Sequence, residues 1–219
     1  MDKTAIINYL IKHGIVAVVR ADSGENLVPI IEAVMEGGVR CIEITMTTPG
    51  ALECLALASE KLSGADVSLG VGSVLDGETA RLAILAGAQY IASPIASAEV
   101  INMAHRYGKP CMPGAYTPTE IYTAWILGGD IIKVFPAGCG GLEYIKAVRA
   151  PLPQIPLIPT GGVDLSNLAD FIKAGVALIG AGGNLVSKKL IEAKDYQGLT
   201  ENARRYSEAL TQAREQLHA

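Results

Sequence analysis

Short apolar runs alternate with amphipathic stretches along the whole chain. The runs are rich in β-branched residues and have the length of strands that are buried on both faces. They span residues 15–20, 39–45, 67–72, 90–93, 110–113, 131–135, 157–160 and 177–180. Helical patterns separate consecutive runs, which is the order typical of βα units with parallel strands.

Helix start signals follow several of these runs, and both ends of the chain have a helical pattern. N-caps are expected at Thr48, Asp76, Ser97, Thr117 and Asp164, with Thr117 and Glu120 forming a capping box. Residues 2–13 predict a helix that lies across the N-terminal end of the strands. Apolar residues from Leu199 to Leu217 recur in steps of four and three, which predicts an amphipathic helix on the exterior.

A weak internal repeat favours closure of the strands into a barrel. A helical pattern ends near Gly38, Gly87, Gly129 and Gly175, at intervals of 42 to 49 residues, and each interval holds two βα units. We therefore expect an α/β fold with a single domain over residues 1–219, a (β/α)8 TIM barrel with an N-terminal helix and a C-terminal amphipathic helix. A doubly wound open sheet is the alternative, but Leu75 stands where a dinucleotide fingerprint needs glycine.

Composition narrows the class of protein. Half of the residues are apolar and 18% are charged, so the chain should fold around a buried core. The formal net charge of -4 gives no electrostatic signature of nucleic-acid binding, and no apolar run approaches the roughly 20 residues that span a bilayer. The four cysteines and three histidines are scattered. We expect a cytoplasmic protein with no metal, no cofactor, no nucleic-acid partner and no membrane partner.

Barrels of this type carry their active sites at the C-terminal ends of the strands. Three charged residues stand out there: Arg20 ends the first expected strand, Glu43 lies late in the second, and Lys133 lies in the sixth. Lys133 interrupts an apolar strand, and burial beside a second cation would favour the neutral amine that attacks ketones. Glu43 could move protons, and the planar fork of Arg20 matches a carboxylate. The alternatives are a lysine that reaches water along a buried stem, a structural ion pair of the glutamate, and a surface arginine.

Two glycine-rich turns follow the last two expected strands. One is Thr160-Gly161-Gly162, and the other is Gly180-Ala181-Gly182-Gly183-Asn184. Backbone N–H groups in such turns can hold a phosphate, because glycine lets the chain approach the oxygens closely. Ordinary loop glycines are the alternative, but the position of both turns favours a phosphate site.

Several short motifs follow one another along residues 7–186. They are Val18-Val19-Arg20, Gly37-Gly38-Val39-Arg40, Ile42-Glu43-Ile44-Thr45, Gly70-Val71-Gly72-Ser73-Val74, Ser93-Pro94, Pro113-Gly114, Ile132-Lys133-Val134-Phe135-Pro136-Ala137 and Pro159-Thr160-Gly161-Gly162-Val163. In this order and spacing they resemble the class I (Schiff-base) aldolases of 2-keto-3-deoxy-6-phosphogluconate (KDPG) and 4-hydroxy-2-oxoglutarate (KHG).

This resemblance implies a Schiff base on Lys133, an acid/base role for Glu43, and a homotrimer that needs no metal. The residues that fall around the pyruvyl group of the family are Ser73, Pro94 and Phe135, and those that fall on its phosphate loops are Thr160, Gly161, Gly162, Gly182 and Gly183. The sequence departs from the family at Ser73 (Thr in many members), Thr47 (Arg in some) and Gly183 (Ser in some). Arg20 would then hold the substrate carboxylate, and the strength of the phosphate preference is open.

We therefore expect a carbon–carbon lyase that acts on a small keto acid. It would cleave a 2-keto-3-deoxy-6-phospho sugar acid such as KDPG to pyruvate and glyceraldehyde 3-phosphate, and KHG to pyruvate and glyoxylate. Two other interpretations stay open. One is a phosphate-binding barrel isomerase or epimerase, which does not need Lys133 as a nucleophile. The other is a non-catalytic metabolite-binding barrel in which Lys133 and Glu43 form a buried structural pair.

Overall fold

Parallel strands form the centre of the molecule. The computed structural model describes residues 1–21 and 27–218. Within these ranges one parallel sheet has six strands in the order β5-β4-β3-β2-β1-β9, and a second has three in the order β6-β7-β8. The strands are β1 (Ile15–Val19), β2 (Cys41–Thr45), β3 (Ser68–Gly72), β4 (Tyr90–Ala92), β5 (Cys111–Met112), β6 (Gly114–Ala115), β7 (Ile132–Val134), β8 (Leu157–Pro159) and β9 (Ile179–Ala181).

The two sheets adjoin at two places. Pro113 alone separates β5 from β6, and directly after β8 Thr160 forms a parallel bridge to Gly180 of β9. Proline has no N–H to donate to a ladder, and the next amide, Gly114 N, donates to Ile95 O. The strand expected over residues 110–113 is therefore observed as β5, which ends before Pro113, and the second short strand, β6, lies beyond the expected range. The expected α/β fold is confirmed as a curled parallel sheet.

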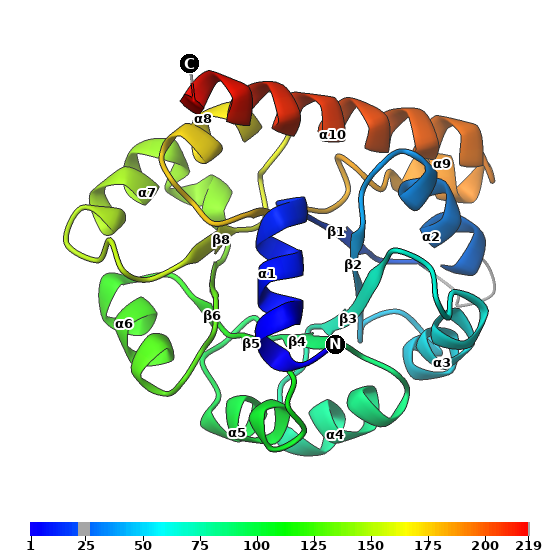
Figure 1. The fold of residues 1–219 in the computed structure, drawn as a ribbon, viewed down its shortest axis with the longest axis horizontal. Coiled ribbons are helices and arrows are strands. Elements are labelled where there is room, and N and C mark those ends of the chain that lie inside the picture. Colours follow the sequence, from blue (N-terminus) through cyan, green and yellow to red (C-terminus); the bar gives the residue numbers. More distant parts are fainter. Residues whose placement is uncertain (22–26, 219) are drawn as a thin grey trace.

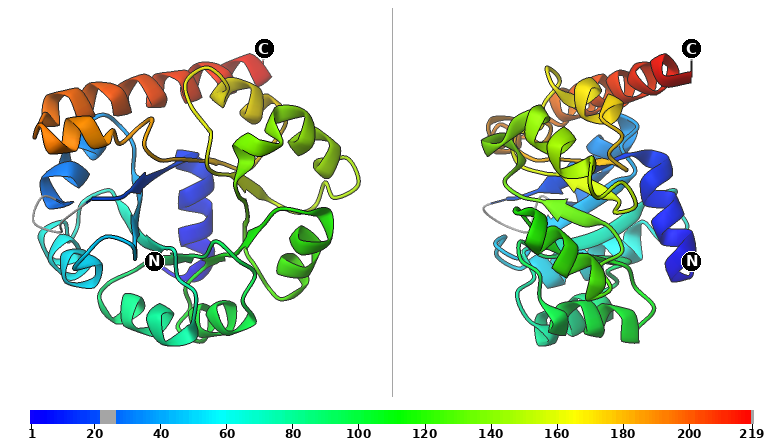
Figure 2. Two further views of the ribbon diagram at one scale, coloured as in Figure 1. Left: turned by 180° about the vertical axis from the view of Figure 1, so that it is seen from behind. Right: turned by 90° about the vertical axis from the view of Figure 1, so that its left-hand side faces the viewer.

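Helices surround the strands (Figure 1). They are α1 (Lys3–His13), α2 (Leu27–Glu36), α3 (Ala51–Lys61), α4 (Gly77–Leu85), α5 (Ala98–Arg106), α6 (Pro118–Ile126), α7 (Gly141–Arg149), α8 (Leu168–Lys173), α9 (Lys188–Glu192) and α10 (Tyr196–His218), with a 3-10 turn, η2, at Ala137–Cys139. Helix α1 crosses the middle of the ring in Figure 1 and lies on one side of the strands in Figure 2. No helix in the described ranges has both the length and the apolar character of a membrane span.

Most of the expected helix signals are confirmed. The side chains that accept N-terminal backbone N–H groups as expected are Asp76, Ser97 and Thr117, the last in a full capping box with Glu120. The buried residues of the expected C-terminal stripe are Leu199, Ala203, Tyr206, Leu210 and Ala213. This stripe packs α10 along the outside of the molecule, against α2 and α8 (Figure 1).

Two expected N-caps are wrong. Helix α3 begins after Gly50 rather than after Thr48, and α8 begins after Asn167 rather than after Asp164. The Thr48 hydroxyl instead accepts a hydrogen bond from Ala21 N at 3.2 Å. A partner that is distant in the sequence therefore takes the oxygen that would have capped the helix.

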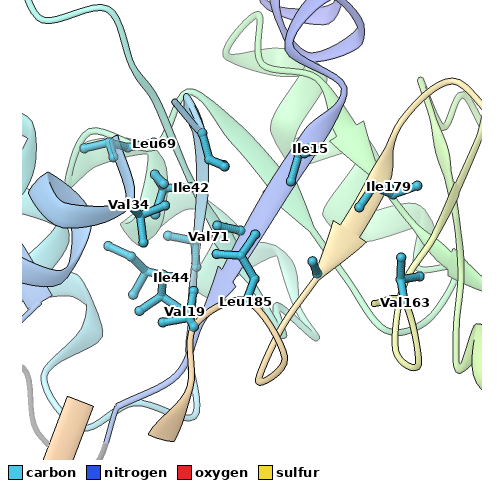
Figure 3. Packing of buried hydrophobic residues seen from close by; sticks show 14 of the residues in the cluster. Ile15, Val19, Val34, Ile42, Ile44, Leu69, Val71, Val163, Ile179 and Leu185 are labelled. Atoms are coloured by element: carbon cyan, nitrogen blue, oxygen red, sulfur yellow. The ribbon is translucent and has the colours of Figure 1, made fainter. Parts of the chain in front are cut away.

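Alternate residues of each strand face opposite sides, which divides the core into two layers. The outer layer lies between strands and helices and includes Ile42 and Ile44 of β2 (Figure 3). The inner layer is enclosed by the strands and contains Cys41 of the same strand, with Ile6 and Leu10 of α1 packed against it. Helix α1 therefore covers the N-terminal end of the interior, as expected, and inward-facing residues further along the strands are left to line a site.

Candidate active site

A buried ion pair joins β2 to β7, which are not neighbours in either sheet. Lys133 Nζ lies 3.1 Å from Glu43 Oε1 and 3.4 Å from Glu43 Oε2. Lys133 is 6% exposed and Glu43 is 2% exposed. Each residue alternates with outward-facing apolar residues of its strand, so both side chains point into the interior. The curl of the sheet thus brings together two residues that are 90 positions apart in the sequence.

Inward-facing glycines make room for polar side chains in this part of the interior. A Cβ at Gly72 would overlap the Glu43 carboxylate, and a Cβ at Gly180 would overlap Thr160 Oγ1. Gly70, the residue of β3 opposite Glu43 in the ladder, likewise gives its space to the ring of Tyr90. Strand glycines at such positions mark the close approach of other groups, here the carboxylate of the ion pair.

A cavity of about 550 Å³ has the ion pair in its wall. Every residue expected at the site lines it, namely Arg20, Glu43, Ser73, Pro94, Lys133, Phe135, Thr160, Gly161, Gly162, Gly182 and Gly183. These residues lie near the C-terminal ends of parallel strands and in the loops that follow, which meet at one end of the sheet. The structure therefore brings the expected residues together around one space, while their chemical roles stay predictions.

A network of hydroxyl groups supports the part of the wall that contains Arg20. Thr45 Oγ1 lies 3.0 Å from Thr47 Oγ1 and 3.5 Å from Thr48 Oγ1. Thr48 in turn accepts the hydrogen bond from the amide of Ala21, the residue after Arg20. Thr45 itself lines the cavity and is not among the expected site residues. The signal for it was available, because a position two residues after Glu43 lies on the same strand face.

The two glycine turns differ in how much they are constrained. Gly161 and Gly162 have φ angles of 80° and 88°, which favour glycine, and a Cβ at Gly162 would lie against the backbone of Gly138 in η2. Gly183 has no atom within 4 Å of the position that a Cβ would take, so a side chain fits there. The first turn therefore requires glycine, whereas the second has open space at Gly183.

The cavity has further lining residues that were not expected. The polar ones are Asn184 and Lys188, at and after the second glycine turn. The apolar ones are Val18, Val163 and Val186. Asn184 is the last residue of the second glycine-rich turn but was not among the expected site residues, and Lys188 belongs to no motif of the sequence. Their position at or after a strand-end glycine turn is the one signal that could have identified them.

The surroundings of Lys133 differ from the expected ones in one respect. Its charged contact is the Glu43 carboxylate rather than a second cation, and its Nζ lies 5.9 Å from the centroid of the Phe135 ring. A lysine must lose a proton from Nζ to attack a ketone, and Glu43 is the acceptor in contact with it. Deeper in the interior, burial raises the pKa of Tyr90 well above its usual value, with smaller contributions from Cys41 and Glu43. The Tyr90 phenol therefore stays neutral beside the pair.

Known proteins with similar sequences include several aldolases. The sequence matches the family described as "Aldolase: KDPG and KHG aldolase" over residues 6–202. A 2-dehydro-3-deoxy-phosphogluconate aldolase of Treponema pallidum is 35% identical over 187 residues, which cover 85% of this chain and 88% of that protein. A 2-dehydro-3-deoxy-6-phosphogalactonate aldolase of Escherichia coli is 33% identical over 172 residues, which cover 78% of this chain and 83% of that protein.

Comparison of the fold with solved structures also identifies an aldolase. A KDPG aldolase from Legionella pneumophila, crystallised with pyruvate captured at low pH as a covalent carbinolamine intermediate, has a TM-score of 0.84 to this chain at 26% sequence identity. The superposition covers 90% of this chain and 96% of that chain. Agreement in sequence and in fold over most of its length shows that the chain belongs to the KDPG and KHG aldolase family.

Proposed function

We propose that this chain is a class I aldolase that cleaves 2-keto-3-deoxy-6-phospho sugar acids, such as KDPG, to pyruvate and glyceraldehyde 3-phosphate. KHG, which would give pyruvate and glyoxylate, is a second substrate. The observation that carries the proposal is the 3.1 Å contact between Lys133 Nζ and Glu43 Oε1 in the wall of a cavity. This arrangement puts a nucleophile and a proton acceptor within reach of one bound keto acid. Membership of the aldolase family supports the same reaction.

The reaction begins when Glu43 takes a proton from Lys133 Nζ. The neutral amine attacks C2 of the keto acid to form a carbinolamine, and Glu43 returns a proton to the departing hydroxyl, so that water leaves and a protonated imine forms. Glu43 then removes the proton of the C4 hydroxyl, directly or through a water. The C3–C4 bond breaks, its electrons move into the imine, and the aldehyde leaves. The resulting enamine takes a proton at C3, and hydrolysis releases pyruvate and regenerates Lys133.

The remaining expected residues hold the two ends of the substrate. The guanidinium group of Arg20 pairs with the C1 carboxylate and keeps C2 next to Nζ. The pyruvyl part is enclosed by Ser73, Pro94 and Phe135. The phosphate is bound by Thr160 and by backbone N–H groups at Gly161, Gly162, Gly182 and Gly183. All of these residues line the cavity, which supports a single bound molecule that reaches from Lys133 to the glycine turns.

Reductive trapping tests the nucleophile. Borohydride added with pyruvate should leave a stable adduct on the peptide that contains Lys133, because reduction of the imine fixes the bond between Nζ and C2. Lys133→Met should take up no label. Lys146→Met is the control, since Lys146 is exposed and pairs with Glu143 on the surface, and it should be labelled like the unmodified chain. An adduct on another lysine would exclude the assignment.

Pyruvate release separates the aldolase from the two other interpretations. An isomerase or epimerase would convert a sugar phosphate without releasing pyruvate, and a non-catalytic binding protein would retain its ligand unchanged. Activity should survive treatment with a chelator, because no step of the mechanism uses a metal. Loss of activity with EDTA that divalent metal restores would contradict the Schiff-base mechanism.

The same proposal includes closure of the curled sheet as a (β/α)8 barrel, in one domain over residues 1–219, and assembly as a cytoplasmic homotrimer. The short break at Pro113 and the bridge between Thr160 and Gly180 support closure. Helices α4 and α6 expose large apolar residues, among them Leu85 and Ile126, which supports contact between copies. Light scattering should give a mass three times that of the chain, and a monomeric mass would exclude the trimer.

A further inference from the structure

One cation of the cavity has no role in the mechanism above. Lys188, the first residue of α9, lines the cavity together with Gly182 and Gly183. Of the described lining residues, the other cations are Lys133, which contacts Glu43, and Arg20, which follows β1. Lys188 thus adds a positive charge to the lining of the cavity, five residues after Gly183 in the sequence.

We propose that Lys188 determines the preference for phosphorylated substrates, by holding the distal phosphate through its charge. The inference rests on the proposed function, because it takes the substrate to lie with C1 at Arg20 and with C2 at Lys133. The phosphate of a six-carbon keto acid then reaches the glycine turns, where Lys188 stands.

The glycine turns explain why a charged side chain matters at this end. They offer backbone N–H groups, but Gly182 and Gly183 supply no side-chain donor, and the space beside Gly183 is open. A phosphate monoester carries about 1.5 to 2 negative charges at neutral pH. Neutral N–H groups can hydrogen-bond to these oxygens without balancing the charge, whereas an ammonium group does both. Lys188 therefore supplies the positive charge and the side-chain hydrogen-bond donor that the two glycines do not have.

Lys188 already has an anionic neighbour that a phosphate can replace. Its Nζ lies 3.7 Å from Glu192 Oε1, one helical turn further along α9, and the two side chains are 68% and 60% exposed. An exposed pair at this spacing contributes little to stability, so loss of the contact with Glu192 costs little free energy. An unphosphorylated keto acid ends in a neutral hydroxyl and gains little from the charge of Lys188. Lys188 should therefore favour phosphorylated over unphosphorylated keto acids.

The test compares kcat/KM for pyruvate release from KDPG and from unphosphorylated 2-keto-3-deoxygluconate. Lys188→Gln should lower kcat/KM for KDPG by about tenfold, mainly through KM, as expected for one charge-assisted hydrogen bond near the surface. The value for the unphosphorylated acid should stay within about twofold, in line with ordinary surface substitutions. Lys189→Gln is the matched control, because it removes the same charge from the next residue of α9, outside the cavity lining. Lys188→Arg should keep the preference.

Equal losses on both substrates would overturn the inference, and so would a loss that Lys189→Gln reproduces. Binding of glycerol 3-phosphate, measured by calorimetry, gives a readout that does not need turnover. Should neither keto acid yield pyruvate, the aldolase proposal fails, yet Lys188→Gln must still weaken glycerol 3-phosphate binding by about tenfold. Binding that is absent, or that Lys188→Gln leaves unchanged, would overturn the role of Lys188 whatever the activity.

Discussion

Gly72 leaves free the volume that Glu43 occupies. A Cβ at residue 72 would overlap Oε1, Cδ and Cγ of Glu43, whose carboxylate is bound to Lys133 Nζ. In the ladder between β2 and β3, Gly72 lies opposite Thr45. The geometry of the ion pair therefore depends on the absence of a side chain from the neighbouring strand.

Gly72→Ala should push the Glu43 carboxylate away from Lys133. Both side chains keep their functional groups, so only the geometry of the pair changes. A displacement of about 1 Å at a reacting group can cost on the order of 100-fold in rate, so we expect a loss of kcat/KM of this size. Gly77→Ala is the control, because its Cβ would make ordinary contacts, at 3.6 Å, with Glu99 and Met103. Pyruvate release near the normal rate in Gly72→Ala would contradict the crowding argument.

Glu43→Gln should keep the shape of the side chain and remove its ability to exchange protons. Turnover should fall by roughly 10² to 10⁴, the range typical for a lost general acid or base. The measurement is kcat for pyruvate release under substrate saturation. Borohydride trapping of pyruvate on Lys133 reports imine formation separately. Near-normal turnover of Glu43→Gln would remove Glu43 from the mechanism.

Loss of one partner of the ion pair should destabilise the fold more than loss of both. Lys133→Met leaves the buried Glu43 carboxylate without its cation, and breaking a buried pair in this way costs on the order of 3–5 kcal/mol. The double variant Lys133→Met/Glu43→Gln removes the unpaired charge and should regain part of that free energy of unfolding. Urea denaturation of the two variants measures the difference. A double variant that is less stable than Lys133→Met would show that the carboxylate is not destabilising by itself.

Gly183→Ser should strengthen the preference for phosphorylated substrates, because the open space beside residue 183 admits a hydroxyl donor. One added neutral hydrogen bond contributes about 1 kcal/mol, which corresponds to about fivefold in the ratio of kcat/KM for KDPG over its unphosphorylated form. Gly183→Ala fills the same space without a donor and should leave that ratio unchanged. Equal ratios for the two variants would mean that the residue 183 side chain does not reach the phosphate.

The free energy of unfolding should fall at alkaline pH, because the buried phenol of Tyr206 ionises less readily in the folded chain than in the unfolded one. Burial raises the pKa of Tyr206 to about 12, and an unfolded tyrosine ionises near pH 10, at about its reference pKa. The unfolded chain therefore loses this proton first, so the stabilisation is complete below about pH 10 and is lost as the pH rises to about 12. Tyr206→Phe removes this titration, and its free energy of unfolding should fall less steeply over that interval. Parallel curves for the two proteins would contradict the assignment to Tyr206.

The sequence alone predicted most of the strands and helices, and those site residues and helix caps that can be recognised from their immediate neighbours in the chain. Apolar neighbours singled out Glu43 and Lys133 as charged residues within expected strands, and short motifs placed the glycine turns after the last two strands. Capping at Asp76 and Thr117 was equally predictable, because the hydrogen bonds stay within a few residues. These features depend on local backbone geometry, which a sequence pattern reports directly.

The tertiary structure decided which groups meet. The contact of Lys133 with Glu43 spans β7 and β2, and the crowding at Gly72 depends on the curl that brings neighbouring side chains into one interior. Thr48 bonds to Ala21 instead of capping a helix, because a buried amide from another strand end competes for its oxygen. Lys188 lines the cavity only through the path of the chain after β9. Distances between elements that are remote in the sequence follow from packing, which no local pattern encodes.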